Sequence, residues 1–324
     1  MGTRLLNLLF VCLLLTLFFA EYGYPQEEIA KYPSRPINFI NAVPPGSGLD
    51  LACRMICKPA EKLLGQPIVV LNKPGATFAI GTAAISSSKP DGYTIGCPGY
   101  PAMFVGSQIE ALSFNTLKDF KWIMQFGYMN FGVTVRSDSP FKSLKDIIDY
   151  AKQNPNKVIN GCGGIGGFGH ILMEQVARKE GVKIVHMPFK GGPDTEKALL
   201  GGHVHIMTGD VNYALLESGQ IRLLALLSET RSAEYPQAPI LKDLGYDIPA
   251  PAILPVAVPK GTPDGIAKKL EATFTSAMKD PEFINGMKNI RFTIVYRNSQ
   301  ELEDYVIRNY EAFTKVVKSM GLSK

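Results

Sequence analysis

Short apolar segments alternate with glycine-rich turns and helix-forming segments along most of the chain, and this alternation limits the fold more than any other feature. The first round has an apolar strand at 37–41, a turn at 45–48, a helix at about 50–64 and a second strand at 68–71. Strands that alternate with helices in this way favour a parallel sheet flanked by helices. The sequence therefore predicts an α/β protein.

The same order of elements recurs in the middle of the chain, from residue 158 onward. This predicts a second α/β domain inserted into the first, with connecting segments near 130–136 and 250–256, and a cleft that closes around a small ligand. The expected domains are 32–133 plus 255–324, and 134–254, with a helical tail that packs on the first domain. The remaining strands and helices are predicted at 75–87, 93–97, 131–135, 144–153, 170–180, 183–187, 194–200, 204–208, 221–228, 252–258, 264–279 and 299–320.

The composition is that of a globular protein long enough for two domains, with 324 residues of which 46% are hydrophobic and 19% charged. These fractions exclude a disordered chain. The formal net charge is +5, and the basic residues are scattered along the sequence. A mild excess of this kind suits a small anionic ligand and is too weak to predict nucleic-acid binding.

The N-terminus reads as a secretory signal peptide rather than as part of the fold. A short basic head, 1–4, precedes an apolar run at 5–19, which is shorter than the roughly 20 residues of a membrane span. Cleavage is expected after Ala20, although Phe18 occupies a position where small residues are preferred, so the cut site stays open. No later run approaches spanning length, and the expectation is a soluble exported protein.

Two turns combine the features that bind anions. Each follows a predicted strand and opens a helix, so its glycines allow close backbone approach and the first helix amides have no intrahelical acceptor. The first turn is 45–50, and the second is 160–170, with six glycines between Gly161 and Gly169. Two such turns, one from each domain, are expected to grip a carboxylate or phosphate. The alternative is ordinary turns and close packing of strand against helix.

Several side chains near these turns are further candidates. Each also fits an ordinary role in a turn, in the core or, for the lysines, in solvent. Asp50 is expected to favour the N-terminus of its own helix. The candidate donors of single hydrogen bonds are Ser47, Thr77 and Thr208, the candidate walls for an organic ligand are Phe78, Tyr100 and Phe168, and the candidate cations are Lys73 and Lys190.

Three other chemistries have weaker signals. Gly161, Gly163 and Gly166 match the dinucleotide spacing, but the next strand, at 183–187, runs into a proline without the acidic residue that binds ribose. A thiol enzyme would pair Cys162 with His170 or His186, but no spacing brings these residues together. A metal site would use His203 and His205, which share one face of a predicted strand, with Asp210 nearby; two ligands from one strand are a weak signal. Cys53, Cys57, Cys97 and Cys162 are expected to be mostly free, buried thiols, and one long-range disulfide stays open.

At this point the motifs resemble those of the tripartite tricarboxylate transporter receptors, also called Bug proteins. The likeness runs in order through nearly the whole chain after the leader. It is carried by Tyr32-Pro33-Ser34-Arg35-Pro36-Ile37, Pro45-Gly46-Ser47-Gly48-Leu49-Asp50 with Arg54, Asn72-Lys73-Pro74-Gly75-Ala76 with Gly81, Pro90-Asp91-Gly92-Tyr93-Thr94, Gly164-Ile165-Gly166 with Gly169-His170, His186-Met187-Pro188-Phe189-Lys190-Gly191, Gly201-Gly202-His203-Val204 and 255–263.

The resemblance implies a two-domain, type II-like periplasmic binding protein with two interdomain crossovers and a ligand cleft between the domains. It implies a non-enzymatic, monomeric receptor without cofactor or metal, which captures a small organic carboxylate between the two turns and delivers it to integral membrane permease subunits. A periplasmic sensor of the same fold and a secreted Cys-dependent hydrolase are the alternatives. The expected ligand-binding residues are Pro45, Gly46, Ser47, Gly48, Leu49, Asp50, Thr77, Phe78, Tyr100, Gly164, Ile165, Gly166, Gly167, Phe168, His170 and Asp210.

The chain departs from the family pattern at some of these positions. Members usually have paired glycines where Gly46-Ser47-Gly48 stands, glycines where Thr77-Phe78 stands, and serines where Cys162 and Gly167 stand. Phe78 would bring bulk toward the cleft, and Gly167 would remove a hydroxyl donor. The expected ligand is therefore smaller than a tricarboxylate, more apolar, or held differently.

Overall fold

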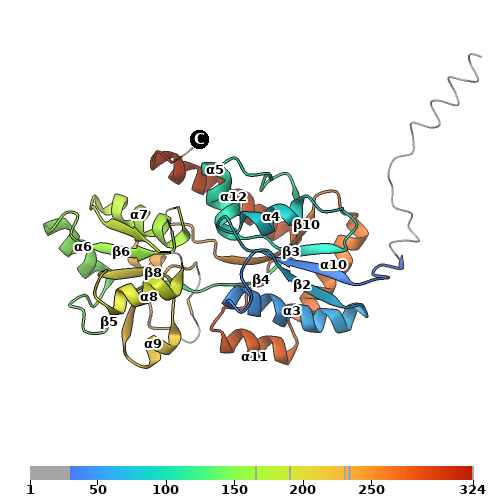
Figure 1. Ribbon diagram of the computed structural model, residues 1–324, viewed down its shortest axis with the longest axis horizontal. Helices are drawn as coiled ribbons and strands as arrows, with labels where there is room; N and C mark the ends of the chain where they lie inside the picture. Colours follow the sequence, from blue (N-terminus) through green and yellow to red (C-terminus); the bar gives the residue numbers. More distant parts are fainter. Residues whose placement is uncertain (1–29, 165, 190, 230, 233–234, 323–324) are drawn as a thin grey trace, which may run out of the picture.

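The computed structural model describes residues 30–164, 166–189, 191–229, 231–232 and 235–322, and it contains two five-stranded sheets (Figure 1). The predicted signal peptide, Ile165 and Lys190 lie outside the described residues. The α/β class and the two-domain architecture predicted from the sequence are confirmed, because strands and helices alternate along the chain and form two separate sheets.

The first sheet has the strand order β2-β1-β3-β10-β4. Strands β2, β1 and β3 are parallel, whereas β10 runs antiparallel to β3 and β4. Helices α3 and α4 cover opposite faces of this sheet (Figure 1). The elements are β1 (Ile37–Asn41), α3 (Gly48–Leu64), β2 (Ile68–Asn72), α4 (Ala79–Ser86), β3 (Thr94–Cys97), a short π-helix (Ala102–Gly106), α5 (Ser107–Ile109), β4 (Phe120–Tyr128) and β10 (Ile253–Pro259).

The second sheet repeats this arrangement with the order β7-β6-β8-β5-β9. Its first three strands are parallel, and β5 pairs antiparallel with β8 and β9. In both sheets the first of the three parallel strands, β1 or β6, therefore lies between the other two, a switch point beside which ligands bind at the carboxyl ends of the strands. The elements are β5 (Phe131–Arg136), α6 (Leu144–Gln153), β6 (Ile159–Cys162), α7 (Phe168–Glu180), β7 (Val185–Pro188), α8 (Gly192–Leu200), β8 (Ile206–Asp210), α9 (Tyr213–Glu217) and β9 (Ile221–Leu226).

The chain passes between the sheets twice. It leaves the first sheet after β4 through Met129 and Asn130, and it returns from β9 to β10 through 227–252, which includes a 3-10 helix at Leu241–Leu244. The C-terminal helices α10 (Asp264–Ala277) and α11 (Pro281–Asn289) pack against α3, and α12 (Ser299–Ser319) packs against β4. The end of α12 also reaches the second domain, because the carbonyl of Ser319 accepts a hydrogen bond of 2.6 Å from Arg178 of α7.

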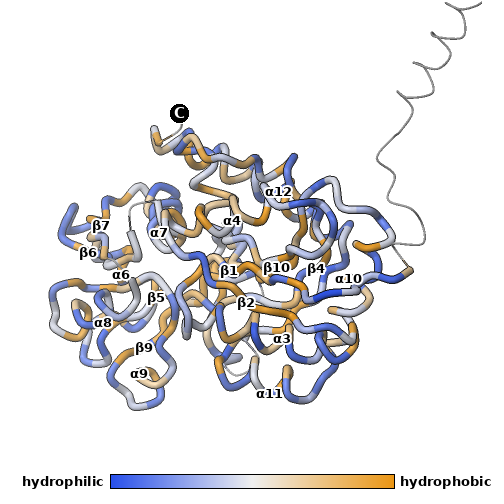
Figure 2. Tube along the Cα trace, turned by 45° about the vertical axis from the view of Figure 1, so that its right-hand side comes forward, coloured by the Kyte–Doolittle hydropathy of each residue, from blue (hydrophilic) through white to orange (hydrophobic). Residues whose placement is uncertain are grey.

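The core is continuous between the two sheets. Rings of Phe168 in α7 and Phe313 in α12 stack with centroids 6.3 Å apart, and both side chains are almost fully buried. Figure 2 shows hydrophobic residues along β1, β10 and β4 and more hydrophilic stretches on the surrounding helices. Cys53, Cys57, Cys97 and Cys162 are free and buried. Within the described ranges, no helix is both long enough and apolar enough to cross a bilayer.

Several elements differ from the sequence-based prediction, and the π-helix, α5, α9 and α11 have no predicted counterpart. The helix expected at 75–87 begins only at Ala79, because Gly75, Ala76, Thr77 and Phe78 all have positive φ angles, of 127°, 44°, 48° and 72°. Strand β4 has no predicted counterpart, because eight of its nine residues are buried and the alternation that identifies a half-exposed strand is missing. The other strands fall within two or three residues of their predicted bounds.

Candidate functional site

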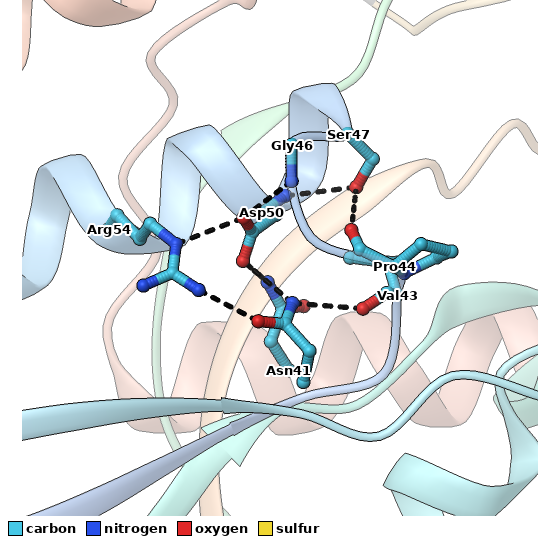
Figure 3. A network of polar contacts seen from close by, with 8 residues as sticks. Asn41, Val43, Pro44, Gly46, Ser47, Asp50 and Arg54 are labelled. Carbon is cyan, nitrogen blue, oxygen red and sulfur yellow. Dashed lines mark hydrogen bonds and ion pairs between the residues drawn. The ribbon is translucent and has the colours of Figure 1, made fainter.

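The carboxylate of Asp50, the third residue of α3, is the centre of the first turn (Figure 3). One oxygen accepts hydrogen bonds of 2.9 Å from the amide of Gly46 and 2.9 Å from Nε of Arg54. The other accepts from Nδ2 of Asn72 at 2.7 Å and of Asn41 at 3.2 Å. Burial opposes ionisation, but the hydrogen bonds from Arg54, Gly46 and Asn72 hold the pKa of Asp50 below its usual value. Asp50 is thus a buried anion, 1% exposed, whose hydrogen bonds hold the first turn in place.

The start of α3 leaves two amides available. The hydroxyl of Ser47 caps the helix by accepting from the amide of Asp50 at 3.3 Å, and it donates to the carbonyl of Pro44 at 3.0 Å (Figure 3). The amides of Gly48 and Leu49 have no acceptor within the described part of the chain. These first-turn amides, next to the exposed backbone of Gly46, are the anion donors that the turn retains.

The second turn is braced in the same way by His170, the third residue of α7. Its Nδ1 accepts a hydrogen bond of 3.0 Å from the amide of Gly166, and the amide of Gly167 donates to Gly164 at 3.2 Å. Burial, and next the neighbouring His186, lower the pKa of His170 to about 4. The ring is therefore neutral near pH 7, which leaves Nδ1 free to accept.

The start of α7 has no side-chain cap, since its N-cap residue is Gly167. As a result, the amides of Phe168, Gly169 and His170 lack an acceptor among the described residues. Gly169 also lies close against β8, because a β-carbon at this position would be 2.3 Å from the carbonyl oxygen of Thr208. Counted among the described residues, the second turn thus presents more unpaired helix amides than the first.

A polar layer supports His170 from below. Its ring packs edge-on against that of His186, with centroids 4.5 Å apart. Asn160, the second residue of β6, contacts Nδ1 of His186 at 3.1 Å and Oγ1 of Thr208 at 2.9 Å. Nε2 of His186 lies 3.3 Å from a carboxylate oxygen of Glu174. Burial lowers the pKa of His186 despite this carboxylate, so both rings are held neutral.

An aromatic cluster joins the two domains beside these turns. The ring of Tyr100 lies 6.1 Å from that of Phe78, 5.8 Å from Phe131 and 5.1 Å from Phe168, centroid to centroid. Tyr100 and Phe168 are each 4% exposed, whereas Phe78 is half-buried. The three predicted wall residues therefore meet in one cluster, with Phe78 as its more accessible member.

Asp210 ends β8 next to this cluster. It pairs with Phe131 across the antiparallel ladder, so the two side chains share one face of the sheet. Its side chain is exposed to solvent, although many protein atoms lie around it. Burial, and next the charge of Glu196, raise the pKa of Asp210 to about 6. Burial and the charge of Asp210 in turn raise the pKa of Tyr100.

Thr77 and Gly166, from different predicted parts of the site, line one recess of ≈ 210 Å³. The recess also includes Pro101, Val105 and Ile109, and its lining is mainly apolar. A larger recess of ≈ 700 Å³ lies between 241–249 and α12, and it includes no residue of either turn. We therefore place the candidate site at the turns and the aromatic cluster, where the carboxyl ends of the parallel strands point.

The structure disfavours the competing chemistries. Burial raises the pKa of Cys162 to about 11, and its sulfur contacts the carbonyls of Gly164 and Met187 at 3.7 and 3.8 Å, so the thiol is protonated and lacks a base. Nδ1 of His205 accepts from the amide of Ile159. Among the described residues, no group of three or more His, Cys, Asp or Glu side chains is arranged to hold a metal ion.

Two residues of the site were not predicted from the sequence. Asn41 is buried beneath the first turn, and Phe131 links Tyr100 to Phe168. Asn41 could have been found from the sequence, since a polar residue at the end of a buried strand needs a hydrogen-bond partner. Phe131 carries none, because an apolar residue at the start of a strand is expected in any core. Ile165, which was predicted, lies outside the described residues, as does the candidate cation Lys190.

Comparisons with known proteins identify a family and a fold. The sequence profile of the family described as "Tripartite tricarboxylate transporter family receptor" matches residues 52–322. The "UPF0065 protein in gbd 5'region" of Cupriavidus necator is 33% identical over 300 residues, which cover 92% of this chain and 91% of that protein. The protein BugT of Bordetella pertussis is 29% identical over 314 residues, covering 94% and 95% of the two chains.

Solved structures give the same result. A TctC solute binding protein from Polaromonas is 29% identical, covers 89% of this chain and 99% of its own, and has a TM-score of 0.77. The periplasmic binding protein BugD is 26% identical, covers 90% of this chain and 100% of its own, and has a TM-score of 0.75. These neighbours are binding proteins, and their fold is the one predicted from the sequence.

Proposed function

The chain belongs to the tripartite tricarboxylate transporter receptor family, and we propose that it captures a small organic carboxylate between its two domains and delivers it to integral membrane permease subunits. The observation that carries this proposal is the pair of turns at 45–50 and 163–170, each of which opens a helix with unpaired amides. Helix amides of this kind bind carboxylates through partial positive charge and hydrogen bonds.

In this proposal the predicted residues have two kinds of role. The amides of Gly48 and Leu49 contact the carboxylate from one domain, and those of Phe168 and Gly169 contact it from the other. Asp50 and His170 act as positioning residues, because each binds a glycine amide of its own turn and is nearly buried. Phe78, Tyr100 and Phe168 form the apolar wall, and Thr77 and Asp210 contact the remainder of the ligand. The other predicted positions, from Pro45 to Ser47 and from Gly164 to Gly167, shape the two turns.

Domain closure follows from the same contacts. A bound anion satisfies amides of both turns at once only when the domains approach each other, so the ligand favours the closed state. The proposed domains are 32–133 plus 255–324, and 134–254. The chain passes from one sheet to the other at 129–130 and 227–252, and a hinge motion of the domains would bend these two segments. We further propose that the protein is exported to the periplasm and acts as a monomer without catalytic activity.

The ligand class is supported by relatives of the fold. Two structural neighbours, which share 24% and 22% sequence identity with this chain, are described as Rpa4515 with adipate and as MatC with bound malate. Adipate and malate both carry terminal carboxylates. For this chain the half-buried Phe78 and the missing hydroxyl at Gly167 favour a ligand that is smaller or more apolar than a tricarboxylate.

A thermal-shift screen tests the proposal. The purified protein is heated with mono-, di- and tricarboxylates, aromatic acids, acidic amino acids and uncharged controls. A ligand at about 100 times its Kd is expected to add about 2.7 kcal/mol, or about 2–4 °C in Tm. The stabilising acid must lose its effect as the methyl ester or amide. Stabilisation by an uncharged solute, with none by any acid, would overturn the proposal and leave the two turns as packing features.

A further inference from the structure

We propose that Asp210 selects a ligand that carries an ammonium group together with its carboxylate, such as an α-amino acid. This inference rests on the proposed carboxylate-binding function and names the ligand class of that same cleft. It follows from an acidic side chain that the carboxylate-binding turns do not account for.

Asp210 is placed to contact the part of the ligand that extends beyond the second turn. Strand β8 runs parallel to β6, with Thr208 beside Cys162, so β8 ends beside the turn that leaves β6. Asp210 lies two residues after Thr208, against which Gly169 packs. Across the ladder it pairs with Phe131, whose ring lies 5.8 Å from Tyr100 and 5.2 Å from Phe168. The carboxylate therefore borders both the second turn and the aromatic cluster.

Among the described residues, none compensates the charge of Asp210. Within the part of the chain that the structure describes, no Lys, Arg or His forms an ion pair with it, and no hydrogen bond reaches its carboxylate. The nearest group identified by its electrostatic influence is another acid, Glu196 of α8, whose carboxylate already accepts a hydrogen bond of 2.9 Å from Asn212. In the ligand-free protein, water solvates Asp210.

Closure of the domains changes this balance. When the cleft closes and water leaves, a carboxylate without a partner becomes costly, and a second carboxylate from the ligand nearby increases the cost. A cation on the ligand removes the cost, because it forms a charge-assisted hydrogen bond with Asp210. The cleft then has two complementary ends, with helix amides for the carboxylate and Asp210 for the ammonium group. A metal ion is a poorer occupant, since no group of ligating side chains surrounds Asp210 within the described ranges.

The test compares each amino acid with the acid that lacks its amino group, in the protein and in Asp210→Asn. The pairs are L-alanine and propionate, L-aspartate and succinate, and L-glutamate and glutarate, each measured by calorimetric titration. The best amino acid is expected to bind at least about tenfold more tightly than its partner, and Asp210→Asn is expected to weaken it by about tenfold to a hundredfold. The same variant should bind the matching deaminated acid more tightly, because it removes the repulsion between Asp210 and the carboxylates of that acid.

Asp149→Asn is the matched control, because it removes the same charge from an exposed residue of α6 that pairs with Lys145. It should leave both affinities unchanged, so a loss confined to Asp210→Asn is a local effect. The inference is overturned if deaminated acids bind the unaltered protein as tightly as amino acids, or if Asp210→Asn leaves the preference intact. That result leaves the carboxylate function standing, whereas a failure of every acid to bind would overturn the proposed function as well.

Discussion

The amide of Gly166 donates to Nδ1 of His170 at 3.0 Å, from a glycine with φ of 75° to the third residue of the following helix. The first domain has the equivalent bond. There Gly46, with φ of 80°, donates at 2.9 Å to the carboxylate of Asp50, again the third residue of its helix. One geometry is thus built twice, with an anion as acceptor in one domain and a neutral imidazole in the other.

This relationship determines which amides remain for a ligand. The glycine amides are already used within each turn, and the left-handed glycines turn the chain so that the helix follows at once. The amides of the first helical residues are left without partners. The acceptor at the third position therefore sets the turn, and the first helical turn supplies the binding atoms.

We predict that Asp50→Asn destabilises the protein by about 2–4 kcal/mol, because an amide offers one acceptor where four donors converge and its NH₂ group faces donors without an acceptor. Urea unfolding measures the change. Asp149→Asn, which breaks an exposed pair with Lys145, should change the unfolding midpoint far less. Equal effects of the two substitutions would show that the network beneath the first turn is not the source of the loss.

His170→Gln should reduce the loss of stability that acid causes. The pKa of His170 is lowered from 6.5 to about 4. In the unfolded chain the imidazole of His170 therefore binds a proton near pH 6.5, whereas in the folded protein it binds one only near pH 4. The contribution of the neutral ring is complete above pH 6.5 and is lost as the pH falls through about 4, by at most about 3 kcal/mol.

Glutamine retains an oxygen that can accept from the amide of Gly166 but does not titrate in this range. Urea unfolding at a series of pH values between 7 and 4 should therefore give a flatter profile for His170→Gln than for the unaltered protein. Some slope remains, because the pKa of His186 is lowered in the same direction. His203→Gln, at an exposed position, controls for the loss of one histidine. Identical slopes for all three proteins would contradict the prediction.

Much of this architecture could be predicted from the sequence because it is local. Apolar runs such as Ile37–Asn41 and the glycines at both turns specify strand, turn and helix from neighbouring residues alone. The partners of Asp50 were harder to predict from the sequence, since Asn41 and Asn72 reach it from two different strands. The role of Phe131 could not be predicted from the sequence, because its contacts with Tyr100 and Phe168 exist only after the domains pack.

The strained backbone before α4 could not be predicted from the sequence either. Thr77 has φ of 48°, a left-handed conformation that is unfavourable for a β-branched residue. Thr77→Gly is therefore predicted to stabilise the protein by about 0.5–1 kcal/mol, since the steric penalty removed exceeds the added chain entropy. Ala83→Gly, within α4, should instead destabilise it by about 1 kcal/mol. A loss of stability in Thr77→Gly would mean that contacts of the threonine side chain outweigh its strain.

The close approach of α7 to β8 gives the last prediction. A β-carbon at Gly169 would lie 2.3 Å from the carbonyl oxygen of Thr208, so Gly169→Ala must displace the start of the helix or the strand. We expect a cost of about 2–3 kcal/mol in urea unfolding. Because the displaced helix start carries the amides of the second turn, the affinity for a carboxylate should fall in the same variant.

Gly163 provides the matched substitution in the same turn. Nothing in the described part of the chain lies within 4 Å of a β-carbon there, and its φ is not positive, so Gly163→Ala should leave the free energy of unfolding nearly unchanged. We expect Gly163→Ala to be stable and to bind the carboxylate, and Gly169→Ala to be unstable and to bind it poorly. That pair of results would show that binding requires the close contact between α7 and β8. If Gly169→Ala were as stable as the unaltered protein, the helix start would have room to move, and fixed amides at that position would not explain carboxylate binding.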